Sequence, residues 1–305
     1  MRALRSLLYV PASRPRMLAK LSRLDCDALL VDLEDGVAPD EKAAARRHLR
    51  EAIGRGAHEG APPWMLRVNP PTTPWHYDDL DLAAELRPGV TVLPKAEEPQ
   101  QVRRFGSRCA TWGGEVGLMI ETARGVARAD ELAGSHPAVG LLVFGSADYR
   151  RSIGARPSKG RDWESLALQQ LLLAARVHGC QAIDSVFFHY RDERGLREHA
   201  APAREMGFDG KSCIHPDQIG PIHEIFTSSE EEIGWALAVK RAWQEQRGSA
   251  RGVVVLDGEM IEALHLELAE RILARGPRSG RAGDPRVQPP TTEESAPGGG
   301  TRCGT

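Results

Sequence analysis

Acidic and basic side chains recur where short apolar runs of this chain end. These residues are Asp32, Glu34, Asp35, Arg67, Lys95, Glu121, Asp148, Asp184 and His215. The cysteines and histidines show no spacing typical of a zinc site. Oxygen ligands of this kind favour a hard cation such as Mg²⁺, which takes one or two protein carboxylates and fills its shell with water and substrate oxygens.

Glu121 and Asp148 are the natural direct ligands, because they follow two consecutive apolar runs. The acids of the segment 32–35 would bind water molecules that coordinate the ion, or would orient the direct ligands from outside the coordination shell. Arg67 has the planar fork that grips a substrate carboxylate through two hydrogen bonds.

A metal ion and an arginine together suit carbon–carbon bond cleavage or formation through an enolate, because both stabilise its developing negative charge. A Schiff-base aldolase would instead need a desolvated lysine. Lys95 is the one convincing lysine at a run end, and the surrounding acids favour the metal route.

The apolar runs predict eight strands that alternate with amphipathic helices. The strands are expected at Ser6–Val10, Ala28–Leu33, Trp64–Val68, Val90–Leu93, Val116–Ile120, Val139–Phe144, Ala182–Val186 and Lys211–Ile214. Helices are expected at Pro39–Ile53, Asp162–His178 and Asp192–Met206. Continuous Val/Ile/Leu runs are typical of parallel strands covered by helices. No Gly-x-Gly-x-x-Gly follows the first strand, so a (β/α)8 barrel over residues 1–227 is favoured over a doubly wound sheet. The active site of such a barrel lies at the carboxyl ends of its strands.

The pattern changes after the eighth strand. A helix is expected at Ser229–Gln246, a short strand at Gly252–Leu256 and a second helix at Met260–Ala274. We interpret residues 228–275 as a helical lid. Residues 276–305 are rich in Gly, Pro, Arg, Ser and Thr, a composition typical of a disordered tail.

Composition argues against several classes of protein. The formal net charge of −2 over 305 residues shows no global bias toward nucleic acid or membrane. The first ten residues run into Pro11 without the long apolar region of a signal peptide, and no apolar run is long enough to span a bilayer. The five scattered cysteines are expected to be reduced, so we predict a cytoplasmic protein.

The motifs resemble those of the citrate lyase beta subunit (citryl-CoA lyase) family, within the HpcH/HpaI aldolase/citrate lyase superfamily. The resemblance covers most of residues 4–275. It rests on the segments 4–11 (LRSLLYVP), 32–39 (DLEDGVAP), 67–69 (RVN), 93–95 (LPK), 120–123 (IETA), 208–211 (FDGK) and 214–216 (IHP), which follow in family order.

The resemblance implies a (β/α)8 barrel with Mg²⁺ bound by Glu121 and Asp148, and a substrate carboxylate bound by Arg67. It implies cleavage of citryl-, malyl- or citramalyl-type thioesters to an acyl-CoA, or an acyl-carrier equivalent, and a 2-oxo acid. Arg14 and Lys20 fall in the segment that contacts CoA, and Lys95 is a further candidate for the phosphates. The resemblance also implies a homo-oligomer, a trimer or hexamer, in which the C-terminal segment closes over a neighbour's site.

Three departures from the family pattern bear on the substrate. Ala147 stands where an acid precedes the presumed ligand Asp148, and Ser185 replaces a usual glycine. Glu262 replaces an aspartate that serves as acid/base from the neighbouring subunit, and its side chain is one methylene longer. A displacement of about 1 Å can cost roughly a hundredfold in rate. The citryl thioester is therefore not assumed to be the substrate.

Two other functions stay open. One is a metal-dependent aldolase for free 2-oxo acids, which would need no CoA-binding surface. The other is a non-catalytic or carrier-dependent subunit that works with acyl carrier protein and transferase subunits.

Overall fold

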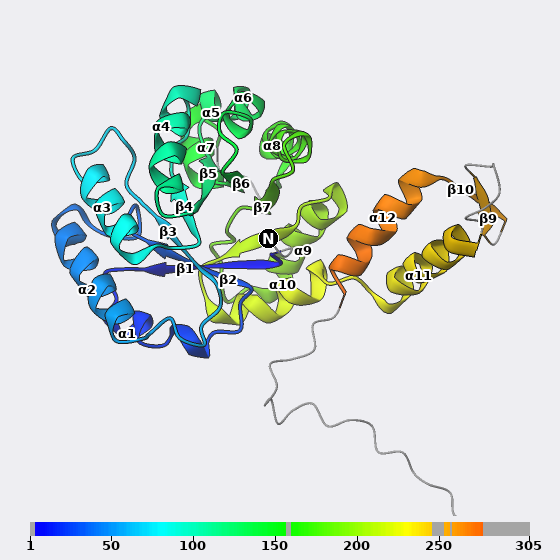
Figure 1. Cartoon of the computed structure of the whole chain (residues 1–305), viewed down its shortest axis with the longest axis horizontal. Helices are drawn as coiled ribbons and strands as arrows, with labels where there is room; N and C mark the ends of the chain where they lie inside the picture. The colour runs from blue at the N-terminus through cyan, green and yellow to red at the C-terminus, as the bar shows by residue number, and fades with distance from the viewer. Residues whose placement is uncertain (1–3, 157–159, 246–252, 257, 277–305) are drawn as a thin grey trace, which may run out of the picture.

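The computed structural model describes residues 4–156, 160–245, 253–256 and 258–276. The predicted disordered tail lies outside these residues, apart from Gly276. Eight parallel strands close into a barrel in sequential order, and helices surround it (Figure 1). The expectation of a (β/α)8 barrel is confirmed.

The strands lie within one or two residues of their predicted bounds. They are β1 (Ser6–Pro11), β2 (Ala28–Asp32), β3 (Trp64–Arg67), β4 (Val90–Leu93), β5 (Glu115–Ile120), β6 (Val139–Phe144), β7 (Gln181–Asp184) and β8 (Gly210–Cys213). β8 pairs with β1 through Ser6 and Lys211, which closes the barrel. The register of β5 against β6 shifts between Val116 and Gly117.

Helices follow each strand on the outside of the barrel. They are α1 (Pro15–Leu18), η1 (Leu21–Arg23), η2 (Pro39–Glu41), α2 (Lys42–Gly54), α3 (His76–Leu86), α4 (Pro99–Ala110), α5 (Ala123–Ala127), α6 (Ala129–Ala133), α7 (Ser146–Ile153), η3 (Asp162–Glu164), α8 (Ser165–Val177), α9 (Glu193–Met206), η4 (Pro216–Gln218) and α10 (Ile219–Phe226).

Alternation along each strand divides the core into two layers. Inward-facing residues such as Leu30, Met65, Met119 and Ile183 fill the barrel interior. The residues between them, such as Val31, pack against the surrounding helices. Because successive strand residues face opposite sides, this parity decides which strand-end residues point into the mouth of the barrel.

A second unit, the arm, projects from the barrel. It consists of α11 (Glu230–Glu245), the two-stranded hairpin of β9 (Val254–Leu256) and β10 (Glu259–Ile261), and α12 (Ala263–Ala274). Met260 and Ile261 therefore lie in a strand, where the sequence predicted the start of the helix. Gly258, at a φ of 87°, lies in the turn between the two strands and favours this hairpin.

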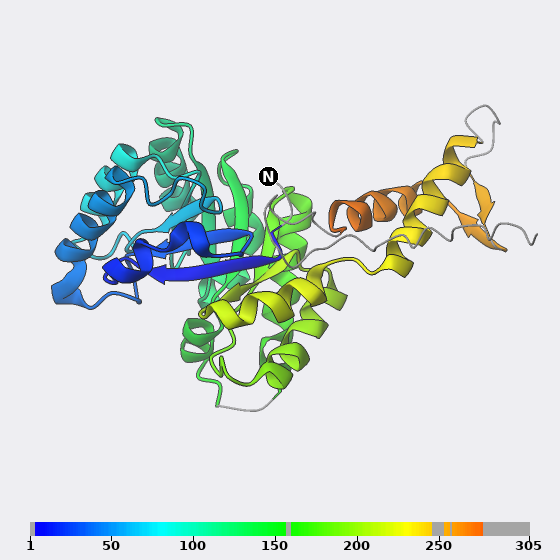
Figure 2. The same cartoon turned by 90° about the horizontal axis from the view of Figure 1, so that it is seen from below.

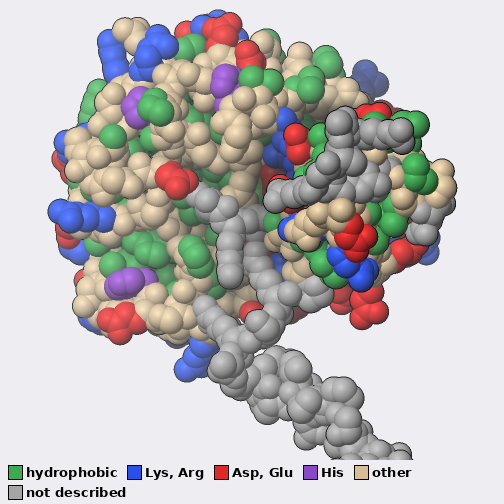
Figure 3. Space-filling view, turned by 45° about the vertical axis from the view of Figure 1, so that its right-hand side comes forward, with side chains coloured by type: hydrophobic (Ala, Val, Ile, Leu, Met, Phe, Trp, Pro, Cys, Tyr) green, Lys and Arg blue, Asp and Glu red, His purple; other side chains and the backbone are tan. Residues whose placement is uncertain are grey.

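The arm is tied down at its base and has a small apolar core of its own. Arg275 donates to Oδ1 of Asp209 at 2.6 Å, and the N–H of Ser228 donates to the carbonyl of Arg275 at 2.9 Å. Two views agree that β1 begins near the base of the arm and runs away from it (Figures 1 and 2). The arm therefore lies on the side of the amino ends of the strands, opposite the mouth, and stands as a separate lobe beside the barrel in Figure 3. Among the described helices, none combines the length and apolar character that a bilayer crossing requires.

Candidate functional site

An acidic loop, residues 32–36, begins at the last residue of β2. Asp32 accepts hydrogen bonds from the N–H groups of Glu34 at 2.8 Å and Gly36 at 2.9 Å, which fold the loop back over the strand end. A Cβ at Gly36 would lie 2.5 Å from Oδ2 of Asp32, so this tight approach requires glycine. Glu34 is buried by the same turn, whereas Asp35 stays exposed.

Arg67, at the end of β3, lies beside this loop. Its Nε and Nη2 donate to both oxygens of Asp32 at 2.8 and 2.7 Å, and its Nη1 lies 3.1 Å from Oε2 of Glu34. Burial alone would raise the pKa of Asp32, but the guanidinium outweighs it and the pKa lies below its usual value. The ring of Tyr9, from β1, stacks 5.1 Å from the guanidinium carbon of Arg67.

Lys95 extends the cluster across β4. Its ammonium pairs with Glu34 and lies 3.1 Å from Oδ2 of Asp35. Its main-chain N–H donates to Oε1 of Glu121 at 2.8 Å. One residue thus contacts both the acidic loop and the end of β5.

Glu121 follows β5 and is 1 % exposed. Burial raises the pKa of this carboxyl to about 8, although the positive charge of Arg67 opposes the shift. Gly145, just after β6, makes room for it, because a Cβ there would lie 2.3 Å from Oε2 of Glu121. Glu121 therefore sits in a deep position that favours a compensating cation.

Asp148 lies in the first turn of α7, directly after β6. Its Oδ2 is 3.9 Å from Nζ of Lys95, and Arg151 pairs with its other oxygen. The charge of Asp148 also contributes to the raised pKa of Glu121. Glu121 and Asp148 thus both lie next to Lys95 at the mouth of the barrel.

The donor set fits a hard divalent cation. Five carboxylates meet three paired cations here: Asp32, Glu34, Asp35, Glu121 and Asp148 against Arg67, Lys95 and Arg151. Oε2 of Glu34 is buried and accepts no hydrogen bond, although Nη1 of Arg67 lies 3.1 Å from it. Within the described residues no group of three or more His, Cys, Asp or Glu side chains lies close enough together to hold a metal ion unaided.

Two of the strand-end residues do not join the cluster. Asp184 points outward toward the helices, where Lys211 donates to it at 2.7 Å and Arg161 at 2.6 Å. His215 caps η4 by accepting from the N–H of Asp217, and its ring stacks on Tyr190. Both therefore stabilise the scaffold around the mouth.

Sequence reasoning missed Tyr9, which packs on Arg67. The signal was available, because Tyr9 has the same parity in β1 as the inward-facing Leu7. Ser185, the replacement for the family's glycine, is fully buried beside Asp184.

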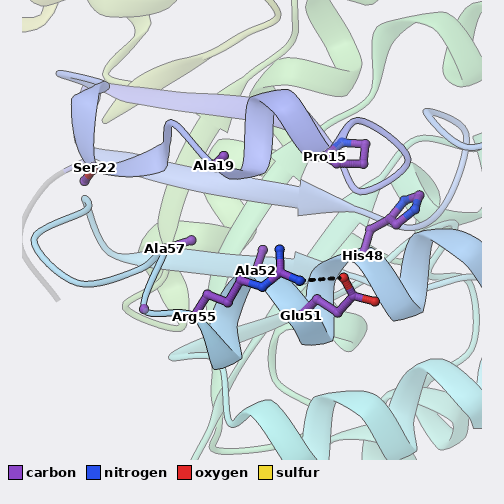
Figure 4. Close-up of a pocket in the computed structure, with 9 residues that line it drawn as sticks. Pro15, Ala19, Ser22, His48, Glu51, Ala52, Arg55 and Ala57 are labelled. Carbon is purple, nitrogen blue, oxygen red and sulfur yellow. Dashed lines mark hydrogen bonds and ion pairs between the residues drawn. The ribbon is translucent and has the colours of Figure 1, made fainter.

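The remaining predicted residues lie away from the acids. Glu262 caps α12 in the arm, far from the mouth of its own chain (Figure 1). Arg14 and Lys20 are exposed around α1. Beside them, a pocket of about 330 Å³ lies between this segment and α2, lined by Pro15, Ala19, Ser22, His48, Glu51, Ala52, Arg55, Gly56 and Ala57 (Figure 4). This pocket is outside the barrel and does not contain the acidic cluster.

Comparison with known proteins agrees with this architecture. Residues 5–216 match the profile of the HpcH/HpaI aldolase/citrate lyase family. The chain belongs to this family. The predicted resemblance is confirmed, and with it the assignment of the chain to a family of lyases.

Several relatives within this family cover nearly the whole chain. A (3S)-malyl-CoA thioesterase of Cereibacter sphaeroides is 37% identical over 89% of this chain and 94% of its own. The mitochondrial citramalyl-CoA lyase of Mus musculus is 33% identical over 88% and 85%. The citrate lyase subunit beta of Escherichia coli is 31% identical over 92% and 95%.

Solved structures of the same family share the fold. The CitE protein of Mycobacterium tuberculosis, in complex with magnesium, acetoacetate and coenzyme A, superposes with a TM-score of 0.74 at 32% identity. The match covers 90% of this chain and 99% of that one. A citrate lyase beta subunit from the same organism is complexed with oxaloacetate and magnesium; it has a TM-score of 0.64 at 32% identity over 73% of this chain and 97% of its own.

Proposed function

We propose that this protein is a Mg²⁺-dependent carbon–carbon lyase that cleaves, or forms, a 3-hydroxy dicarboxyl or tricarboxyl acyl-CoA thioester. The observation that supports it most is the buried Glu121 beside Asp148, with Lys95 between them, at the carboxyl ends of the strands. Relatives act on malyl-CoA and citramalyl-CoA, which supports the same class of substrate here.

Glu121 and Asp148 would hold the ion. When bound, Mg²⁺ supplies positive charge that stabilises negative charge developing on a thioester or 2-oxo acid oxygen. Asp32, with both oxygens on Arg67 and its loop, keeps the guanidinium aimed at the mouth. Arg67 would then bind the substrate carboxylate, with Glu34 and Asp35 arranging the polar groups around it.

The proposed cleavage breaks the bond between C2 and C3 of the acyl chain. The C3 hydroxyl loses its proton to a base and becomes the carbonyl of the 2-oxo acid. The bonding electron pair passes to C2, giving the enolate of the acyl-CoA product, which takes up a proton from an acid. The reverse sequence forms the bond.

We infer that the exposed Arg14 and Lys20 bind the phosphates of CoA. The pocket between α1 and α2 adjoins this segment, and alanines line it together with His48 and with Arg55, which pairs with Glu51 at 3.4 Å (Figure 4). These features suit a nucleotide end that lies outside the barrel while the thioester enters the mouth. Lys95 is less suited to phosphates, because Glu34 and Asp35 occupy its ammonium.

Glu262 is proposed to act as the acid/base of a neighbouring copy. Its arm leaves the barrel on the side opposite the mouth, so an intramolecular role would require the anchored base of the arm to detach. A second copy offers the side chain without that cost. The site would then be complete only in the oligomer.

The distribution of exposed apolar side chains supports such an assembly. Among the described residues, all but Met17 and Tyr77 of the large exposed apolar side chains fall into two groups. The arm patch comprises Leu237, Val255, Met260, Leu264 and Leu268, and the α8 patch comprises Ile153, Leu166, Leu173, Val177, Phe188 and Tyr190.

Charges differ between the two patches. Three exposed acids, Glu262, Glu267 and Glu270, and one exposed base, Arg271, flank the arm patch, whereas Arg151, which pairs with Asp148, adjoins the α8 patch at α7. Contact between two different patches is head-to-tail, and such contacts close into rings when the rotation permits. We therefore propose a cyclic homo-oligomer, with a trimer as the expected form.

Thioester hydrolysis is the second candidate, since four relatives at 36–37% identity are named malyl-CoA thioesterases. Hydrolysis would have to take place in the mouth of the barrel. The Ser6–His223–Asp27 cluster is unsuitable, because Ser6 is fully buried at the amino end of β1 and both Ser6 and Asp27 contact the same ring nitrogen, at 2.7 and 3.5 Å.

Mass spectrometry of products from citryl-, malyl-, citramalyl- and methylmalyl-CoA, with Mg²⁺ and with EDTA, tests the proposal. A lyase gives an acyl-CoA and a 2-oxo acid in the presence of Mg²⁺ but not in EDTA. A thioesterase gives free CoA and the hydroxy acid. Absence of cleavage across the panel would contradict both.

A further inference from the structure

Lys95 adopts a backbone conformation that is rare outside glycine. Its φ is 50°, in the left-handed region, and it follows Pro94 at the end of β4. Such conformations persist only where the surroundings hold them, and they concentrate at functional sites. The contacts around Lys95 should therefore explain why its backbone adopts this conformation.

The first set of these contacts involves the main chain of Lys95. Pairing with β5 resumes at Ala96, whose N–H donates to the carbonyl of Met119 at 3.3 Å. The N–H of Lys95 is turned away from this ladder and donates to Oε1 of Glu121 at 2.8 Å. The left-handed turn thus fixes the orientation of a fully buried carboxylate.

The second set of contacts involves the side chain of Lys95. Its ammonium pairs with Glu34 and Asp35 on the acidic loop and stands 3.9 Å from Oδ2 of Asp148. The side chain is 23% exposed, so solvent screens these contacts only partly. A resident positive charge therefore lies among the acids that would receive Mg²⁺.

We propose that Lys95 is a positioning residue of the metal centre with two separable roles. Its main-chain N–H orients Glu121, and its ammonium is an internal counter-cation that orders the acidic cluster before Mg²⁺ arrives and opposes Mg²⁺ electrostatically once it binds. This inference rests on the metal site of the proposed function, although not on the identity of the thioester.

Lys95→Met separates the two roles, because it keeps the N–H and removes the charge. In isothermal titration at low ionic strength we expect it to bind Mg²⁺ roughly tenfold more tightly than the wild type. In EDTA its melting temperature falls, and Mg²⁺ raises that temperature by more than it does for the wild type. Lys95→Arg keeps the charge and stays close to the wild type in both measurements. Equal or weaker Mg²⁺ binding by Lys95→Met overturns the counter-cation role.

The backbone role is tested with Lys95→Gly and Lys95→Ala, which both lack the ammonium. Glycine adopts a positive φ without the penalty that alanine incurs, so the glycine variant is expected to melt at the higher temperature and to bind Mg²⁺ at least as tightly. A more stable alanine variant overturns this part. Arg194→Met, which removes an exposed cation on α9, is the matched control and should change neither measurement.

These readouts are binding and melting, so they are independent of turnover. If the thioester panel gives no products while Lys95→Met still binds Mg²⁺ more tightly, the lyase proposal fails and this inference stands. If products form while Lys95→Met binds Mg²⁺ only as tightly as the wild type does, the lyase proposal stands and this inference fails.

Discussion

Arg67 donates to both carboxylate oxygens of Asp32, at 2.8 and 2.7 Å, across the adjacent strands β2 and β3. The same aspartate accepts two N–H groups of the acidic loop. One buried carboxylate therefore fixes both the arginine that would bind substrate and the loop that carries Glu34.

Asp32→Asn should destabilise the protein and impair catalysis. The change leaves the buried guanidinium without its ionic partner, which costs on the order of 3 kcal/mol. We expect urea denaturation to show that loss and kcat/KM to fall at least about tenfold. Asp78→Asn, which removes an exposed partner of Arg46, is the control and should be nearly neutral. Wild-type stability for Asp32→Asn would show that Arg67 does not depend on this pair.

Glu121→Gln should be at least as stable as the wild type when EDTA is present. Burial raises the pKa of Glu121 to about 8, so the folded protein already favours a neutral side chain at this position. A folded-state pKa above the unfolded value means that the carboxyl stabilises the fold less as the pH rises toward 8, whereas glutamine has no such dependence. Melting curves at pH 8 test this. A large loss of stability would indicate that the ionised form is needed in the metal-free protein.

His199 should make the fold sensitive to mild acid. Burial lowers the pKa of His199 to about 2, and the charges of Lys211 and Arg161 act in the same direction. Below about pH 6.5 the unfolded chain binds a proton that the folded chain refuses, so stability falls as the pH falls. Between pH 7.5 and 5.5 the wild type should lose roughly 1 kcal/mol more than His199→Gln, whose amide oxygen can still accept from Lys211. Parallel urea midpoints for the two proteins would contradict this.

Glu262→Gln should lower turnover while leaving Mg²⁺ binding intact, because the proposed ligands of the ion are Glu121 and Asp148 and Glu262 is proposed only as an acid/base. Co-expression with Glu121→Gln then gives mixed oligomers. If each site combines a barrel from one copy with an arm from another, random mixing restores about a quarter of the sites. No recovery in purified mixed oligomers would argue for action within one chain.

The two apolar patches should be needed for assembly. Leu268→Glu in the arm patch and Leu173→Glu in the α8 patch each place a charge in the proposed contact, so light scattering after size exclusion should detect smaller species. Tyr77→Glu, on an exposed residue of α3 outside both patches, is the matched control. Unchanged mass for both patch variants would exclude this contact.

The strands were predictable because continuous apolar runs report burial on both faces. Position at a strand end does not by itself predict the outward orientation of Asp184, because that orientation depends on the parity of the residue along β7. Ile183 fills the barrel interior, so its neighbour Asp184 must face the helices, where Lys211 and Arg161 neutralise it. The same rule places Arg67, two residues after the inward-facing Met65, in the mouth.

Other features depend on contacts that no single segment reveals. The left-handed turn at Lys95 is coupled to Glu121 on the next strand. The hairpin that replaced the start of the last predicted helix needs β9 and β10 to pair. The direction of the arm follows from its anchoring by Arg275 on Asp209, residues 66 positions apart.

The central claim is that Glu121 and Asp148 share one divalent ion. Electron paramagnetic resonance with Mn²⁺, a surrogate for Mg²⁺, measures this directly. We predict one bound Mn²⁺ per chain, displaced by Mg²⁺ and lost in both Glu121→Gln and Asp148→Asn. Wild-type Mn²⁺ binding by either variant would contradict the account.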